Sequence, residues 1–131
     1  MSDGGFAAIR AVDYTVIYVR DMGAMRAFYE DVLRFRLARA LSENWLEYHV
    51  GANTLVLSRP RLTEGEAPVP AGTAALQLAF RVPPGDVDRC AAELEAKGIA
   101  ILSPPTDRPF GHRTLFFRDP DGNVIEIFAE I

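Results

Sequence analysis

One arrangement of apolar patterns occurs twice along this 131-residue chain, and it limits the possible folds more than any other feature. Each half contains a strand-like segment, a segment with helical spacing, and then three further strand-like segments. One helix can cover only one face of a four-stranded sheet, so the other face of each sheet must be buried elsewhere. Pairing of the two sheets predicts a concave channel between them, which is a natural place for a small ligand.

The first half is expected to span residues 11–58, after an N-terminal tail at 1–10. It begins with a strand at 11–20, and Asp21 is the predicted N-cap of a helix that follows. Four side chains share one face of that helix: Met25, Phe28, Tyr29 and Val32. Three strands should follow, at 35–41, 45–50 and 54–58, with a tight turn at 51–53.

A segment rich in proline and glycine, residues 59–72, is predicted to be a linker to a second half at 73–131. After a strand at 74–82, Asp86 is a plausible cap for a helix that ends near Gly98. Four residues share the apolar face of this helix: Val87, Cys90, Ala91 and Leu94. The remaining pattern predicts a short strand at 100–102, a loop at 103–112, a strand at 113–118, a turn at 119–122 and a last strand at 123–129.

Charge and composition narrow the class of protein. The net charge is -4 and no basic patch stands out, which argues against nucleic-acid binding. A single cysteine excludes an intramolecular disulfide and fits a reducing cytoplasm. The start of the chain lacks signal-peptide features, and no apolar run approaches the ~18 residues of a membrane span. We therefore expect a soluble, cytoplasmic, globular protein.

Two stretches, VDYTVIYVRDMGAMRAFYEDVLRFRL and GHRTLFFRDPDGNVIEIF, resemble the vicinal-oxygen-chelate superfamily, which includes glyoxalase I, bleomycin resistance proteins and extradiol dioxygenases. The second stretch is the more specific, because DPDGN precedes an apolar-Glu-apolar strand. The resemblance covers about residues 11–130. It implies an α+β fold of two βαβββ modules, whose mixed sheets curve around a ligand channel, and a homodimer.

The same resemblance implies metal-ligand positions on the first and last strands of each module. Those positions hold Tyr14, Val56, Gln77 and Glu126, and only Gln77 and Glu126 are ligand types of that family. A divalent ion needs three or more suitable donors, so one amide and one carboxylate would hold Zn, Mn, Fe, Ni or Mg weakly. We favour no tightly bound metal. The turn acids Asp119 and Asp121 are expected to be structural.

The acid in the last strand needs a physical reason, because an unpaired buried charge costs several kcal/mol. Strand alternation places Val124, Glu126 and Phe128 on one face, and Ile125 and Ile127 on the other. If the isoleucines face the helices, Glu126 points into the channel. Its partner would be a ligand, Tyr14, Gln77 or an arginine such as Arg81, and it could serve as a general base. The alternative is a solvated acid at the channel mouth.

Eight other residues are candidates for ligand binding: Tyr14, Tyr18, Trp45, His49, Gln77, Phe110, Thr114 and Phe116. Aromatic rings can stack on a ligand, and hydroxyl, imidazole and amide groups can hydrogen-bond it. For Tyr18 and Phe116 the alternative is core packing. A register shift of one residue near 51–53 would move Trp45 and His49 to the opposite face. Phe110 lies in the predicted loop, together with His112, where loops often close over ligands.

Three functions are compatible with these residues. The favoured one is a small-molecule binder, such as a sequestering resistance protein, that needs no metal. The second is a divalent-metal-dependent lyase, isomerase or dioxygenase that uses Gln77 and Glu126. The third is a metal-free enzyme in which Glu126 is the general base.

Overall fold

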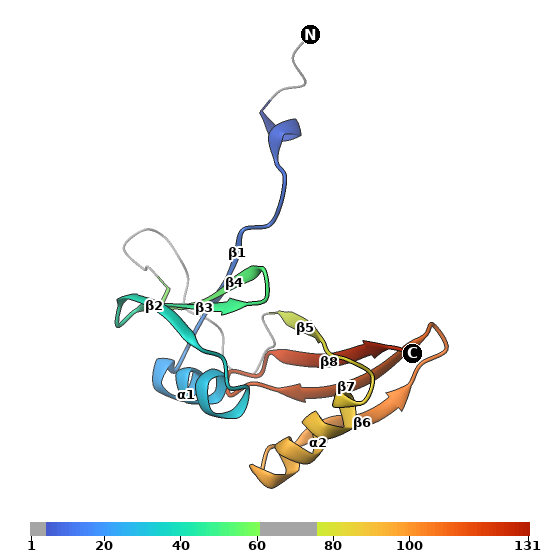
Figure 1. The fold of residues 1–131 in the computed structure, drawn as a ribbon. Coiled ribbons are helices and arrows are strands. Elements are labelled where there is room, and N and C mark those ends of the chain that lie inside the picture. Colours follow the sequence, from blue (N-terminus) through green and yellow to red (C-terminus); the bar gives the residue numbers. More distant parts are fainter. Residues whose placement is uncertain (1–4, 61–75) are drawn as a thin grey trace.

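The computed structural model describes residues 5–60 and 76–131, which form two four-stranded mixed sheets (Figure 1). Sheet A has the order β1 (Tyr14–Tyr18), β4 (Asn53–Ser58), β3 (Trp45–Val50) and β2 (Leu37–Ser42). Sheet B has the order β5 (Gln77–Arg81), β8 (Val124–Glu130), β7 (His112–Arg118) and β6 (Ile101–Asp107). The first pair of each sheet is parallel and the others are antiparallel. The expected α+β fold of two βαβββ modules is confirmed.

The helix of the first module consists of two parts, α1 (Met22–Ala27) and the π-helix η2 (Phe28–Val32). Asp21 caps α1 as expected, because its carboxylate accepts a hydrogen bond from the backbone N–H of Ala24 at 3.0 Å. The helix predicted after Asp21 is confirmed, and its second half is wound as a π-helix. The wider π turn accompanies two adjacent buried aromatic rings, Phe28 and Tyr29, which meet edge to face at 5.3 Å.

The helix of the second module is α2 (Asp86–Ala96). The prediction that Asp86 caps it was wrong by one position, since Gly85 is the N-cap residue and no side chain bonds the helix end there. Asp86 instead lies in the first turn, where its negative charge interacts favourably with the positive end of the helix dipole. The predicted apolar face is confirmed for Val87, Ala91 and Leu94, which are buried.

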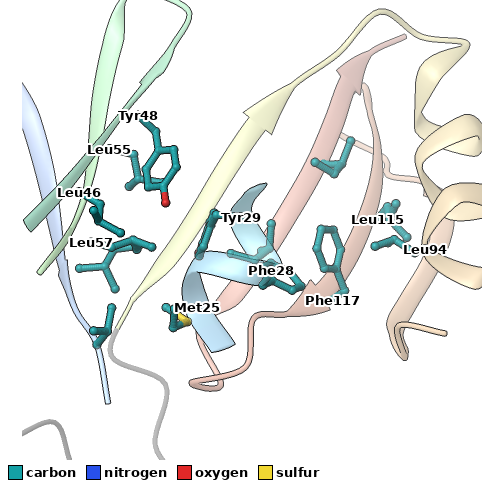
Figure 2. Packing of buried hydrophobic residues seen from close by; sticks show 14 of the residues in the cluster. Met25, Phe28, Tyr29, Leu46, Tyr48, Leu55, Leu57, Leu94, Leu115 and Phe117 are labelled. Atoms are coloured by element: carbon teal, nitrogen blue, oxygen red, sulfur yellow. The ribbon is translucent and has the colours of Figure 1, made fainter. Parts of the chain in front are cut away.

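A single core joins the two modules, with α1 and η2 between the sheets (Figure 2). Leu46, Tyr48 and Leu57 of sheet A lie on one side of this helical segment, and Leu115 and Phe117 of sheet B lie on the other. The Phe28 ring of the first module packs against the Phe117 ring of the second module, with ring centroids 6.1 Å apart. Each sheet therefore turns one face toward the helices, and we call the opposite face its open face.

The edge strand β6 corrects a sequence prediction. Residues 103–112 were expected to form a loop, but β6 extends through Asp107 and includes Pro104 and Pro105. Proline lacks a backbone N–H and is tolerated at a sheet edge or a bulge, and both conditions hold here. The pairing of β6 with β7 shifts register on either side of Ser103. The actual loop contains only residues 108–111.

The turn before β8 is held by a buried carboxylate. Asp119, which is 4% exposed, accepts hydrogen bonds from the backbone N–H groups of Asp121 and Asn123, both at 3.0 Å. Its other oxygen accepts from the Tyr29 hydroxyl and the Asn123 amide, both at 2.9 Å. The structural role expected for Asp119 is confirmed, and the same carboxylate ties η2 to sheet B.

Most of the predicted linker, 59–72, falls outside the described residues. The backbone of Arg59 is described and donates a hydrogen bond to the carbonyl of Asn44 at 3.1 Å. Of the tail predicted at 1–10, Phe6–Ala8 form a short 3-10 helix. No helix in the described ranges is both long and apolar enough to cross a membrane.

Candidate functional site

Strand alternation defines the two open faces. Ile125 and Ile127 pack in the core with the helices, so Val124, Glu126 and Phe128 project from the open face of sheet B, as the sequence predicts. The pairing register adds neighbours from β5 and β7: Gln77, Ala79, Arg81, Thr114 and Phe116. The open face of sheet A carries Tyr14, Val16, Tyr18, Trp45, Glu47, His49, Thr54 and Val56.

Glu126 has one hydrogen-bond partner in the described part of the chain. The Gln77 side-chain amide donates to its Oε1 at 3.1 Å, from the neighbouring parallel strand β5. Phe116 lies directly across the β7–β8 pair from Glu126. The acid is half-buried and meets an amide and an aromatic ring, so the open face holds a carboxylate with unused acceptor capacity.

An aromatic stack lies beside this acid on sheet B. The imidazole of His112 stacks on Phe128 with ring centroids 4.8 Å apart, and Phe110 meets His112 edge to face at 5.2 Å. The guanidinium of Arg81 lies over the Phe128 ring at 4.9 Å. Arg81 was a candidate partner of Glu126, but it pairs instead with Glu130 at 2.7 Å.

Thr114 is almost fully buried, at 1% exposure, and its hydroxyl accepts a hydrogen bond from Arg108 Nε at 2.9 Å. Arg108 also donates to the hydroxyl of Ser103 at 3.3 Å. Sequence reasoning missed Arg108, because the segment that positions it was predicted to be a loop.

The open face of sheet A has its own polar cluster. The Trp45 indole N–H donates to Glu47 Oε2 at 2.7 Å, and Arg39 pairs with the same carboxylate at 3.5 Å. Tyr14 meets Trp45 edge to face with ring centroids 6.2 Å apart. These residues line a cavity of about 310 Å³, together with Val56. Glu47 was not among the predicted site residues, although it follows from the alternation of β3.

The other sheet A candidates are less enclosed. His49 is exposed and lies across the β3–β4 pair from Thr54. Tyr18 is 36% exposed at the end of β1. The structure thus groups the eight predicted ligand-binding residues by module: Tyr14, Tyr18, Trp45 and His49 lie on sheet A, Gln77, Thr114 and Phe116 lie on sheet B, and Phe110 lies in the loop between β6 and β7.

Within one chain, the donor groups at the four positions implied by the resemblance do not form a divalent metal centre. Glu126 and Gln77 offer one carboxylate and one neutral amide on sheet B, whereas Val56 has no donor atom and Tyr14 lies on sheet A. Among residues 5–60 and 76–131, no three His, Cys, Asp or Glu side chains converge. Tight binding of Zn or a similar ion needs such a set.

A second cavity, of about 250 Å³, lies on the helix side between the modules. Its walls are mainly apolar and include Phe35, Phe80, Cys90 and Phe117. Burial raises the pKa of the Cys90 thiol, with smaller effects from the charges of Glu93 and Asp86. A thiol of this kind stays protonated and behaves as an apolar side chain.

Comparisons with known proteins agree with this geometry. A family model described as Glyoxalase/Bleomycin resistance protein/Dioxygenase superfamily matches residues 11–127. Virulence protein STM3117 of Salmonella typhimurium is 31% identical over 125 residues, which cover 91% of this chain and 83% of that protein. The crystal structure of STM3117 has a TM-score of 0.73 at 28% identity, covering 94% of this chain and 98% of that chain.

Two further solved structures share the fold. A lactoylglutathione lyase from Agrobacterium tumefaciens has a TM-score of 0.76 at 24% identity, covering 93% of this chain and 95% of that chain. A glyoxalase/bleomycin resistance protein/dioxygenase from Nocardioides has a TM-score of 0.81 at 22% identity, covering 95% and 85%.

Proposed function

Because the chain belongs to the glyoxalase/bleomycin resistance protein/dioxygenase superfamily, we propose that it binds a small organic molecule on the open face of sheet B. The observation that carries the proposal is Glu126, a half-buried carboxylate on this face whose one hydrogen-bond partner among the described residues is the neutral Gln77 amide. A ligand amine or hydroxyl would complete its hydrogen bonds. Phe116 and the His112–Phe128 stack would supply apolar contact to a ring.

The channel is completed, in this proposal, by a second copy of the chain. The helical segment lies between the two sheets, so both open faces of one chain point away from its own core. Tyr14 on sheet A is 51% exposed, and Gln77, Ala79 and Arg81 on β5 are all exposed. Apposing sheet A of one subunit to sheet B of the other would bury both faces and enclose the ligand.

Binding is proposed to proceed without a tightly held metal, since the donor set of Gln77 and Glu126 is too small for one. Elemental analysis of protein purified without added metal tests this part. The expected result is a substoichiometric content of Zn, Mn, Fe, Ni and Mg. A stoichiometric divalent ion that Glu126→Gln loses would contradict it.

Benzylamine and benzyl alcohol are suitable probes for the binding itself, because each joins a ring to a hydrogen-bond donor. We expect saturable shifts of the Gln77 side-chain amide in NMR spectra of the full chain. Glu126→Gln should weaken benzylamine binding by roughly tenfold, which is the loss of one charge-assisted contact. Glu95→Gln, at an exposed acid on α2, is the matched control and should leave binding unchanged.

Light scattering at micromolar concentration tests the second copy. A dimer is expected, and a monomer that still binds benzylamine would show that one sheet suffices. Absence of any probe-induced shift at Gln77 and on the open face of sheet B would overturn the proposed function.

A further inference from the structure

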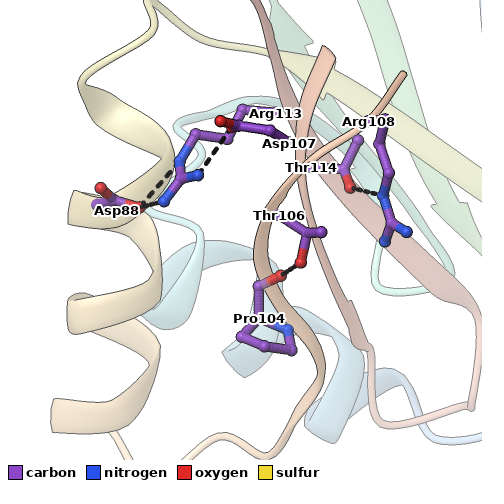
Figure 3. A network of polar contacts seen from close by, with 7 residues as sticks. All are labelled: Asp88, Pro104, Thr106, Asp107, Arg108, Arg113 and Thr114. Carbon is purple, nitrogen blue, oxygen red and sulfur yellow. Dashed lines mark hydrogen bonds and ion pairs between the residues drawn. The ribbon is translucent and has the colours of Figure 1, made fainter. Parts of the chain in front are cut away.

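Two arginines near the β6–β7 hairpin meet opposite kinds of partner (Figure 3). Arg113 donates to Asp88 and to Asp107, each at 2.8 Å, so two carboxylates compensate its charge. Within the described part of the chain, the Arg108 side chain donates to the hydroxyls of Thr114 and Ser103 alone. Hydroxyls are neutral, and no ion pair to Arg108 exists within residues 5–60 and 76–131. The charge of Arg108 is therefore uncompensated in the described part of the chain.

The hairpin fixes the direction of the Arg108 side chain. The backbone N–H of Arg108 donates to the carbonyl of His112 at 2.7 Å, and Gly111 closes the turn with a φ of +91° that favours glycine. Thr114 lies on the open face of sheet B, and its buried hydroxyl holds Nε against that face. The guanidinium is thus positioned over the sheet, half-buried, instead of extending into water.

Thr114, which holds this cation, has aromatic neighbours that belong to the proposed ligand site. Thr114 lies across the β7–β8 pair from Phe128, on which His112 stacks. The next residue pair along the same strands and face is Phe116 with Glu126. A cation, a ring stack and a carboxylate therefore follow one another along the open face of sheet B.

We infer that Arg108 binds the anionic group of the ligand, which is an aromatic or heteroaromatic molecule that carries a carboxylate or phosphoryl group. This inference rests on the proposed function and names the ligand class of the same site. A guanidinium presents several N–H donors in a fixed fork that suits planar oxyanions. Two of these donors are used by neutral hydroxyls, which orient the fork without neutralising it. An oxyanion would complete the bonding with charge-assisted hydrogen bonds.

The test uses benzoate and phenyl phosphate as anionic probes, with benzamide as the neutral probe of similar shape. The readouts are the Arg108 side-chain Nε–H signal and the His112 ring signals in NMR titrations of the full chain. We expect both anions to shift these signals saturably and to bind at least about tenfold more weakly to Arg108→Gln. Benzamide should bind the wild type and Arg108→Gln equally.

Arg89→Gln is the matched control, because it removes one positive charge from an exposed position on α2 and should leave anion binding within twofold of wild type. Arg108→Lys is a second variant that keeps the inference testable if Arg108→Gln does not fold. It keeps the charge and should retain part of the affinity for phenyl phosphate, but it loses the planar fork that benzoate needs.

The outcomes separate the two claims. Anion affinities that Arg108→Gln leaves unchanged would overturn the inference, as would a loss that Arg89→Gln reproduces. Benzylamine binding at Gln77 without any anion effect at Arg108 would overturn the inference while the proposed function stands. If neither benzylamine nor the anions shift signals on the open face, both fail.

Discussion

The open faces of sheets A and B each place a half-buried carboxylate on a central strand, but the surroundings of the two acids differ. Glu47 on sheet A already accepts the Trp45 indole N–H at 2.7 Å and pairs with Arg39 at 3.5 Å. Glu126 on sheet B accepts one hydrogen bond from residues 5–60 and 76–131, from the Gln77 amide at 3.1 Å. The first acid is satisfied within its own sheet, and the second retains capacity for a partner.

The two modules also differ in how they hold these strands. The turn between β3 and β4 consists of exposed residues, Gly51 and Ala52, and depends on a positive φ at Gly51. The turn between β7 and β8 is built on the buried Asp119 carboxylate. The strand that carries Glu126 is therefore the more firmly anchored, which suits a side chain that must bind a ligand in a fixed position.

The largest effect is expected for Asp119→Ala. It removes the acceptor for two backbone N–H groups and leaves the Tyr29 hydroxyl and Asn123 amide without this partner. We expect a loss of about 2–4 kcal/mol in the free energy of unfolding, measured by urea denaturation. Ala52→Ser, in the exposed turn of the other module, should change it by less than about 0.5 kcal/mol. Equal effects at the two turns would remove the difference in anchoring.

Tyr29→Phe gives the next largest effect and adds a pH dependence. Burial, and then the charge and hydrogen bond of Asp119, raise the pKa of the Tyr29 phenol. The folded state therefore keeps the phenol protonated at a pH where the unfolded chain ionises it. The stability that Tyr29 contributes is complete below pH ~10 and falls as the pH rises further.

We expect Tyr29→Phe to cost about 1 kcal/mol near neutral pH, through the lost hydrogen bond to Asp119. The difference in free energy of unfolding between wild type and variant should shrink above pH ~10. Urea denaturation of both proteins across this range measures it. A difference that stays constant with pH would mean that burial and the contact with Asp119 do not raise the pKa of the Tyr29 phenol in the folded state.

Much of this arrangement is readable from the sequence, and β8 shows why. Successive side chains of a strand point to opposite faces, so the single acid between Ile125 and Ile127 indicates that Glu126 takes the open face and the isoleucines the core face. The cap at Asp21 is equally local, because it needs only a carboxylate three residues before a backbone N–H. These features depend on neighbours in the chain, so the printed residues suffice to predict them.

The features that escaped prediction depend on partners far along the chain or on position in the sheet. Pro104 and Pro105 indicate a loop by composition, and only the edge position of β6 makes a strand acceptable. That error concealed Ser103 of β6, one of the two hydroxyls that hold the Arg108 side chain. Tyr29 and Asp119 are 90 positions apart, and the residues next to either one do not predict the hydrogen bond between them.

A smaller and purely local effect should follow from Glu47→Ala. The chain has one tryptophan, so the indole N–H of Trp45 gives a single NMR signal. Its hydrogen bond to the Glu47 carboxylate should hold this signal downfield. We expect an upfield shift in Glu47→Ala and none in Glu43→Ala, which alters an exposed acid before β3. An unchanged signal would mean that Glu47 is as available to a ligand as Glu126.

The smallest effect is expected at the rim of sheet B, where Arg81 pairs with Glu130 at 2.7 Å. The hydrogen bond and charge of Arg81 lower the pKa of the Glu130 carboxyl. Its contribution to stability is thus present above the ordinary pKa of glutamate, near 4, and is lost as the pH falls through the lower folded value. Both side chains are largely exposed, so the pair is weak and screened by salt.

Glu130→Gln should slightly flatten the acid limb of the pH–stability curve at low ionic strength and leave it unchanged at 1 M salt. A loss comparable with that of Asp119→Ala would show that this rim pair, and not the buried turn, anchors the strand that carries Glu126.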